Sequence, residues 1–271
     1  MTDDSRRPPK FPLALDRVAR GSARPADRTL RPQRLVQSAV TDAQRLRPPT
    51  GHGLDSDAVR RRMVERLRTD GLTSEPVLAA LARVPRHCFV DSGLVAQAYE
   101  DTSLPIGLGQ TISKPSVVGR MLALLQQRAE AVGRRDLGRV LEIGTGCGYQ
   151  AALLGELGRS VVSIERLQAL HELARERLAP LRRHNLRLVY GDGRLGHAPQ
   201  APYDSIIAAA GGEDLPPAWL DQLAVGGRLV APMAGGPRGG QVLLVVDRDE
   251  QGLREQRHEA VHFVPLKSGT D

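Results

Sequence analysis

The sequence is poor in aromatic residues and in cysteine. Phe, Trp and Tyr together make up 3% of its 271 residues, so a core must be built mainly from Ala, Val, Leu and Ile, as in a buried parallel sheet covered by helices. The two cysteines, Cys88 and Cys147, are far apart and belong to no metal-ligand spacing. Neither a disulfide framework nor a zinc site is indicated, and we expect no metal.

Long apolar runs are also missing. No stretch approaches the roughly 18 apolar residues that a membrane helix needs. The N-terminus has no uninterrupted apolar segment of the signal-peptide type. We therefore expect no membrane partner and a cytoplasmic location.

Glutamate is absent from the first fifty residues, where the positive charge of the chain is concentrated. Residues 1–50 hold eleven basic and five acidic residues, whereas the remainder holds 27 and 26. Prolines recur in this segment, and they interrupt helices and strands. The sequence predicts a disordered basic arm over residues 1–53 and one folded domain over 54–271. Five aspartates argue against a transit peptide, and the near-neutral remainder argues against nucleic acid as a partner.

The folded domain is predicted to begin with two helices. Val59, Met63 and Leu67 recur at helical spacing, which predicts a helix from about Asp57. Ser74 is placed to cap a second helix.

A long connection separates these helices from the next one. Residues 85–114 contain no regular pattern, and connections of this length are often functional. Pro115 then begins a helix that is predicted to run to about Glu130.

Short apolar runs alternate with helical stretches from residue 139 onward. The apolar runs are 139–143, 160–165, 186–190, 203–209 and 227–232, and the helical stretches are 149–158, 167–180 and 216–223. This rhythm predicts an α/β fold with a doubly wound, mostly parallel, Rossmann-like sheet. Two further runs, 241–247 and 259–265, follow without a long helix between them and predict an antiparallel C-terminal edge.

The sharpest local signal is a strand that runs into a glycine loop and then a helix, over residues 141–149. Its three alternating glycines allow positive φ and a close approach of the backbone to a ligand. A dinucleotide fingerprint would need its third glycine one residue later, where Tyr149 stands, and no Gly-Lys-Ser/Thr follows. The spacing favours S-adenosylmethionine over a bare structural turn. The cofactor contacts that we predict here are Glu142, Gly144, Thr145, Gly146, Gly148 and Tyr149.

The ends of the next two strands carry acidic residues. Glu165 follows Gly148 by 17 residues and is placed to accept hydrogen bonds from both hydroxyls of a ribose. Asp192, beside Gly193, is placed to bind an adenine amino group. A surface glutamate and a plain β-turn are the structural alternatives. We predict cofactor contacts from Glu165, Arg166, Asp192 and Gly193.

From about residue 57 to 267 the chain resembles a protein-L-isoaspartate O-methyltransferase. The family signature is similar to residues 104–115, which include Gln110-Thr111-Ile112-Ser113, followed by the cofactor loop at 140–151. The short stretches 84–91 and 261–266 also match. A glycine loop alone would indicate only a methyltransferase, whereas the block at 110–113 is much more specific.

The resemblance implies a Rossmann-like methyltransferase fold and a defined reaction. A methyl group passes from S-adenosyl-L-methionine to the free carboxylate of L-isoaspartyl residues, and of D-aspartyl residues as a further acceptor, in damaged proteins and peptides. The methyl ester then closes to a succinimide, which begins repair. Such a carboxylate is ionised at neutral pH, so its attack on the methyl group needs no general base.

The resemblance also implies the residues at the acceptor. Ser113 is implied as the catalytic hydroxyl, and Thr111, Ile112 and Ser113 are implied to contact the cofactor. The alternative for Ser113 is a helix N-cap ahead of Pro115.

Three positions depart from the usual family pattern. Cys147 stands where serine is common, Ser116 where an aromatic residue is common, and Arg194 where tryptophan is common. The acceptor is therefore less firmly indicated than the cofactor. A related methyltransferase acting on tRNA or on one dedicated peptide, and a module that binds isoaspartyl segments without turnover, are the alternatives. We expect a monomer.

Overall fold

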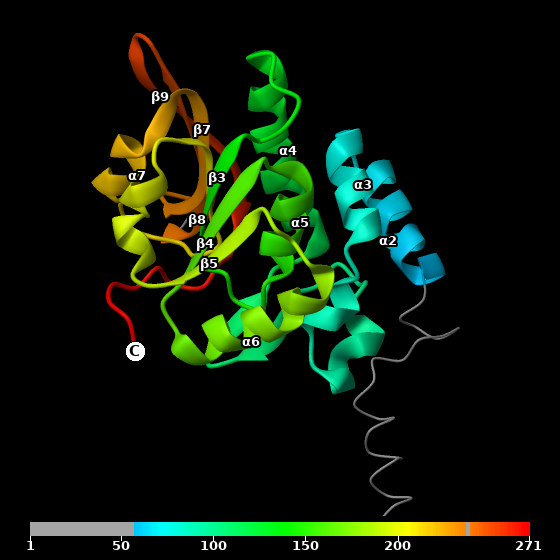
Figure 1. Ribbon diagram of the computed structural model, residues 1–271. Coiled ribbons are helices and arrows are strands. Elements are labelled where there is room, and N and C mark those ends of the chain that lie inside the picture. Colours follow the sequence, from blue (N-terminus) through cyan, green and yellow to red (C-terminus); the bar gives the residue numbers. More distant parts are fainter. Residues whose placement is uncertain (1–56, 237–238) are drawn as a thin grey trace, which may run out of the picture. The chain divides into compact units, whose positions relative to one another are not determined.

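The computed structural model describes residues 57–236 and 239–271 (Figure 1). The predicted basic arm over residues 1–53 lies outside the described residues. Among the described residues, no helix is long and apolar enough to cross a membrane.

The described chain begins with helices α2 (Asp57–Thr69) and α3 (Glu75–Arg83), as the sequence predicts. Met63 and Leu67 are buried on the inner face of α2. Ser74 occupies the N-cap position of α3, but its side chain makes no capping hydrogen bond. The position that we predicted for the cap is confirmed, and the hydroxyl that should form it is not used.

The connection over residues 85–114 is more regular than the sequence suggests. Two short 3₁₀ helices at Arg86–Phe89 and Ser92–Gln97 precede an antiparallel hairpin of β1 (Leu104–Gly107) and β2 (Gln110–Ile112). The sequence shows no regular pattern here because strands this short leave too few residues for an alternating pattern to be recognised.

The tip of this hairpin has an unusual backbone. Gly107, Leu108 and Gly109 all have positive φ, and Leu108 is the one residue of the three with a side chain. Gly107 and Gly109 make the tight reversal possible because they lack a Cβ atom. The reversal brings β2 back beside β1 and directs residues 110–113 toward helix α4 (Pro115–Ala131).

A seven-stranded sheet forms the centre of the domain, with strand order β5-β4-β3-β6-β7-β8-β9. The first five strands in this order are parallel, and β8 and β9 continue the sheet antiparallel. The predicted sheet and its antiparallel edge are confirmed. The strands are β3 (Arg139–Ile143), β4 (Ser160–Glu165), β5 (Leu186–Tyr190), β6 (Tyr203–Ala208), β7 (Leu223–Ala234), β8 (Gln241–Asp249) and β9 (Gly252–Val261).

The last strand lies earlier in the sequence than the apolar pattern predicts. The pattern predicts a strand at 259–265, whereas β9 covers Gly252–Val261. Nearly all of its side chains are exposed and many are charged, so the strand carries no apolar alternation. Backbone pairing with β8 defines it instead.

Helices cover both faces of the sheet. On one face α4 packs beside α5 (Tyr149–Leu157) and α6 (Gln168–Leu178), with α2 and α3 outside them (Figure 1). On the other face the short helix α7 (Pro217–Asp221) buries Trp219 against the apolar side chains of β6 and β7. The arrangement is doubly wound, as the alternation of strands and helices predicts.

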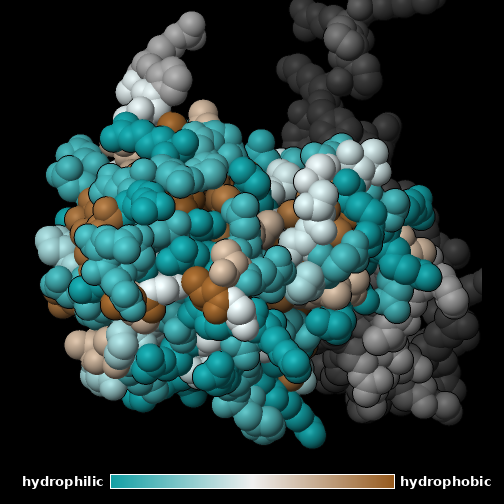
Figure 2. Space-filling view, turned by 90° about the horizontal axis from the view of Figure 1, so that it is seen from above, coloured by the Kyte–Doolittle hydropathy of each residue, from teal (hydrophilic) through white to brown (hydrophobic). Residues whose placement is uncertain are grey.

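The surface turned toward the viewer in Figure 2 is mostly hydrophilic, and its hydrophobic residues form small separate groups. A face of this kind does not display the broad apolar patch that marks an obligate interface. The carboxyl ends of the parallel strands lie at one edge of the sheet, where ligands bind in folds of this type.

Candidate active site

A single pocket joins the carboxyl ends of β3, β4 and β6. About 890 Å³ of space lies between its walls, with the solvent at its open mouth included. Most of its walls come from five segments that are far apart in the sequence, namely 110–113, 143–147, 164–167, 209–210 and 264–267. The pocket therefore combines the glycine loop with the block that carries the family resemblance.

The glycine loop is fixed to the neighbouring strand. The backbone nitrogens of Gly144 and Thr145 donate to the carbonyl of Ile164, over 2.9 and 3.1 Å. Gly144 and Gly146 have φ of 89° and 55°, conformations that favour glycine. The loop thus turns sharply at the end of β3 and lines the pocket with backbone.

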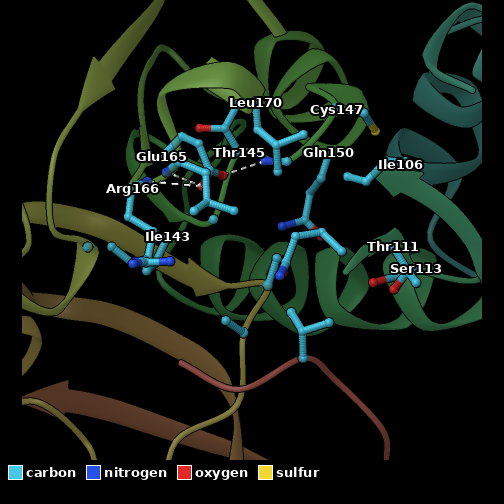
Figure 3. Close-up of a pocket in the computed structure, with 18 of the residues that line it drawn as sticks. Ile106, Thr111, Ser113, Ile143, Thr145, Cys147, Gln150, Glu165, Arg166 and Leu170 are labelled. Atoms are coloured by element: carbon cyan, nitrogen blue, oxygen red, sulfur yellow. Dashed lines mark hydrogen bonds between the residues drawn. The ribbon is translucent and has the colours of Figure 1, made fainter. Parts of the chain in front are cut away.

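Glu165 connects the two strand ends (Figure 3). Its Oε2 accepts a hydrogen bond from the backbone nitrogen of Gly146 at 2.8 Å, and its Oε1 accepts two from those of Arg166 and Leu167, both at 3.0 Å. A carboxylate offers about four lone-pair sites, so roughly one is left for a ligand. The side chain is buried but still lines the pocket.

Glu142 lies behind the pocket wall. Its side chain is fully buried, does not line the pocket, and accepts a hydrogen bond from Ser163 Oγ at 2.5 Å. Ser163 in turn lies 2.6 Å from the hydroxyl of Thr145, which does line the pocket. Burial raises the pKa of Glu142 from 4.5 to about 8, so this carboxyl is mainly protonated at neutral pH. The structure thus places Glu142 one layer away from the contact that we predicted.

Gly148 and Asp192 also lie outside the pocket lining. A Cβ atom on Gly148 would stand 2.9 Å from Leu178 Cδ1, so this glycine allows α5 to pack closely against α6. Asp192 Oδ1 accepts from the backbone nitrogen of Arg194 at 2.8 Å, and Oδ2 accepts from that of Gly269 at 2.7 Å. Its carboxylate therefore holds backbone.

The structure brings together the other predicted cofactor residues. The predicted residues that line the pocket are Thr111, Ile112, Ser113, Gly144, Thr145, Gly146, Tyr149, Glu165, Arg166 and Gly193. Ten of the thirteen predicted residues thus share one cavity.

A C-terminal segment, residues 264–271, crosses the pocket and the strand ends beside it. Residues 264–267 line the pocket, and the backbone of Leu266 donates to Gly211 at 2.8 Å. Beyond them Gly269 accepts from Arg166 Nε at 2.8 Å, and the hydroxyl of Tyr190 donates to the backbone oxygen of Asp271 at 2.5 Å. In the sequence, only the family match at 261–266 points to this segment, because nothing in the last residues indicates what they contact.

Ser113 lies in the pocket wall and does not cap the helix that follows. The N-cap of α4 is Lys114, without a side-chain hydrogen bond, so the capping alternative for Ser113 is wrong. Asp101 takes that role, since its carboxylate accepts from the backbone nitrogen and the hydroxyl of Ser116, at 2.8 and 2.7 Å. The hydroxyl of Ser113 has no hydrogen-bond partner among the described residues.

Tyr149, the first residue of α5, forms part of the pocket wall. Its ring is buried, with the Arg86 guanidinium carbon 4.9 Å from its centroid and the Phe89 ring centroid at 5.6 Å. Arg86 is itself fully buried and donates through Nε to the carbonyl of Ala98 at 2.8 Å. Burial lowers the pKa of Arg86 and raises that of Tyr149 to about 12. Tyr149 thus anchors the segment that leads into the hairpin.

Some pocket residues had no sequence signal that we recognised. Gln150 directly follows the glycine loop, and its place on the first turn of α5 could have identified it. Leu170, Ala209 and Ala210 are apolar residues that become pocket walls only through the fold. Among the described residues, no group of three or more His, Cys, Asp or Glu could hold a metal ion.

Comparison with known proteins now decides the family. A family model described as Protein-L-isoaspartate(D-aspartate) O-methyltransferase (PCMT) matches residues 58–271. The chain belongs to the protein-L-isoaspartate O-methyltransferase family. It methylates isoaspartyl residues with S-adenosylmethionine as the methyl donor, and isoaspartyl proteins are its substrates.

Two curated relatives are similar over most of their length. A protein-L-isoaspartate O-methyltransferase from Methylibium petroleiphilum is 60% identical over 272 residues, with 100% of both chains covered. The one from Leptothrix cholodnii is 66% identical and covers 89% of this chain and 84% of its own.

Solved structures of protein-L-isoaspartate O-methyltransferases agree with the fold. One described by that name is 28% identical, with a TM-score of 0.67, over 77% of this chain and 66% of its own. A putative one from Plasmodium falciparum, solved in complex with S-adenosyl-L-homocysteine, is 23% identical with a TM-score of 0.65, over 77% and 98%. The predicted methyltransferase fold is confirmed.

Proposed function

We propose that the pocket is where this protein methylates the free carboxylate of L-isoaspartyl residues, with D-aspartyl residues as a further acceptor. Its cofactor end, defined by Gly144, Gly146 and Glu165, would bind S-adenosylmethionine. Its acceptor end, defined by Thr111 and Ser113, would hold the carboxylate. The observation that carries the proposal is that one cavity is lined by both groups of residues.

At the cofactor end the residues fit a nucleoside. The free lone-pair site on Glu165 accepts one ribose hydroxyl, rather than the two that the sequence suggested. The glycine loop lets the ligand approach the backbone, and Leu170 and Ile164 give it apolar walls. Ile112, Thr145, Tyr149, Arg166 and Gly193 complete this end, and Thr111 and Ser113 contact the cofactor from the acceptor end. Glu142, Gly148 and Asp192 shape it from outside.

At the acceptor end the chemistry needs positioning more than proton transfer. The bound cofactor supplies a methyl group on a positively charged sulfur. The acceptor carboxylate is ionised at neutral pH, so Ser113 donates a hydrogen bond to one carboxylate oxygen while the other oxygen is free to attack. A C–O bond forms as the S–C bond breaks, and the products are the methyl ester and S-adenosylhomocysteine. The ester then loses methanol as it closes to a succinimide.

Methyl transfer to three acceptors tests the function. Purified protein is given S-adenosylmethionine with a radiolabelled methyl group, and either an isoaspartyl peptide, the same peptide with aspartate, or bulk tRNA. We expect label on the isoaspartyl peptide, and not on the aspartyl peptide or tRNA. Label on tRNA, or binding of the isoaspartyl peptide without methylation, would contradict the proposal.

The remaining expectations concern the state of the protein in the cell. We extend the proposal to a monomer that acts in the cytoplasm on damaged proteins in general, without nucleic acid as a partner. Light scattering on the purified protein should give a mass near 29.4 kDa. A mass of twice that value would contradict the monomer.

A further inference from the structure

Gln150 is a pocket residue to which the proposed function gives no role. It is the second residue of α5, and its side chain is only 8% exposed. It lines the pocket, and Figure 3 shows its side chain pointing into the pocket from α5, between Glu165 and Ser113. Gln150 thus stands where the cofactor end meets the acceptor end.

The side-chain amide of Gln150 lacks a partner. Its Nε2 is buried and forms no hydrogen bond with any of the described residues. Buried donors in proteins are nearly always paired. An unpaired donor that points into a ligand pocket therefore marks a position for an acceptor atom of the ligand.

Glu142 interacts with this amide but does not occupy both of its N–H groups. The interaction with Gln150 lowers the pKa of Glu142, although burial has the larger, opposite effect, and Glu142 Oε1 is itself buried without a partner among the described residues. An amide carries two N–H groups. A hydrogen bond to Glu142 would therefore leave one N–H for a second acceptor, and the protonated Glu142 would not repel an anion beside it.

The surroundings favour an anionic oxygen as the ligand atom. Gly148 at the N-cap of α5 makes no side-chain hydrogen bond, so the positive end of this helix is not occupied by a capping side chain. Two positively charged residues line the pocket, Arg166 and Lys267. Arg166 donates through Nε to the carbonyl of Gly269, and Lys267 is exposed at the surface. A neutral amide such as that of Gln150 supplies a buried donor that neither of these residues provides.

We infer that Gln150 binds a carboxylate in the pocket through its side-chain amide. The inference rests on the proposed function, because both ligands of that reaction carry such a group. It is either the amino-acid carboxylate of the cofactor or the isoaspartyl carboxylate of the acceptor. In both cases Gln150 fixes the relative position of donor and acceptor.

Three ligands distinguish the two sources. Gln150→Leu removes the amide, and Gln126→Leu is the matched control, since Gln126 is a buried glutamine of α4 that donates to Glu130. Calorimetry measures the affinity for S-adenosylhomocysteine and for methylthioadenosine, which lacks the amino-acid carboxylate. Steady-state kinetics with an isoaspartyl peptide gives KM and kcat.

We expect Gln150→Leu to weaken one carboxylate ligand by about ten- to a hundredfold and to leave methylthioadenosine binding unchanged. Weaker S-adenosylhomocysteine binding identifies the cofactor carboxylate, and a higher peptide KM with unchanged S-adenosylhomocysteine binding identifies the acceptor. Equal losses for S-adenosylhomocysteine and methylthioadenosine, or no loss for any ligand, would overturn the inference.

Two further results keep the outcome clear. If Gln150→Leu does not fold, Gln150→Asn keeps an amide but withdraws it by one methylene, and the same selective loss is expected. A wild-type protein that neither binds S-adenosylhomocysteine nor methylates the peptide would refute the proposed function and the inference together. An active wild type with an unaffected Gln150→Leu would refute the inference alone.

Discussion

The two ends of the pocket are built in different ways. At the cofactor end the central carboxylate is largely paired within the protein, because Glu165 accepts three backbone hydrogen bonds and holds the glycine loop against β4. At the acceptor end the hydroxyls of Thr111 and Ser113 have no hydrogen-bond partner among the described residues. The first end is a rigid frame that a cofactor enters, whereas the second presents free donors for the substrate to bind.

The largest effect on ligand binding is expected from Glu165→Ala. The change removes the ribose contact and frees the backbone nitrogen of Gly146, so affinity for S-adenosylhomocysteine should fall by about 1.5–3 kcal/mol. Calorimetric titration measures this loss, with Glu172→Ala on the exposed side of α6 as the control. Unchanged affinity would remove Glu165 from the cofactor end.

Ser113→Ala should act at the other end. The rate with an isoaspartyl peptide should fall by about ten- to a hundredfold, because one positioning contact is lost, while S-adenosylhomocysteine binding stays near wild type. A residual rate is expected because the carboxylate needs no deprotonation. Ser116→Ala is the matched control, since its hydroxyl bonds Asp101 and its loss should cost about 1 kcal/mol of stability with little change in rate. Wild-type turnover in Ser113→Ala would contradict the assignment.

Glu142→Gln tests whether the frame contains a protonated carboxyl. With its pKa raised to about 8, Glu142 favours folding below pH 4.5 and loses this contribution as the pH rises to 8, because only the unfolded chain ionises. Relative to wild type, the variant should therefore gain up to about 4 kcal/mol of stability between pH 4.5 and pH 8. Urea unfolding at both pH values measures it. A pH-independent difference would show that Glu142 is ionised in the fold.

Tyr190→Phe should have a smaller effect on the cofactor end. It removes the hydroxyl that holds the C-terminal segment through Asp271, so S-adenosylhomocysteine should dissociate about two- to fivefold faster. Tyr203→Phe is the matched control, because it loses a similar bond to the carbonyl of His197, away from the pocket. Stopped-flow displacement measures both dissociation rates. Equal rates in the two variants would show that the C-terminal segment does not control the release of S-adenosylhomocysteine.

Removal of residues 1–53 should have no effect on either end. The segment lies outside the residues matched by the family model, and the pocket is lined entirely by residues from 106 onward. Turnover of an isoaspartyl peptide by the shortened, folded protein should stay within about twofold of the full chain. A tenfold fall would show that the segment contributes to the site.

The same contrast explains what the sequence could predict. The frame at the cofactor end is local, since a strand, a glycine loop and a helix follow one another within 139–157, and their spacing is visible in the sequence. The doubly wound, mostly parallel sheet follows equally from the alternation of apolar runs and helices. Glu165 was found because it ends the next strand.

Other parts depend on contacts that sequence spacing does not contain. Whether a strand-end carboxylate faces a ligand or backbone depends on its neighbours, and Asp192 turned out to hold Gly269. The pocket walls at 209–210 and 264–267 meet only in the folded chain. Ser113 was identified through the family block, and only the folded chain, with Lys114 at the N-cap and Asp101 bonded to Ser116, removed the capping alternative.

The most direct test of the two-ended pocket is a pair of calorimetric titrations on Glu165→Ala and Ser113→Ala. Each variant is titrated with S-adenosylhomocysteine, and then, once saturated with it, with an isoaspartyl peptide. We predict that Glu165→Ala weakens only the first interaction and Ser113→Ala only the second, each by at least about tenfold. Equal losses of both interactions in either variant would contradict the account, because the two ends would then not be separate.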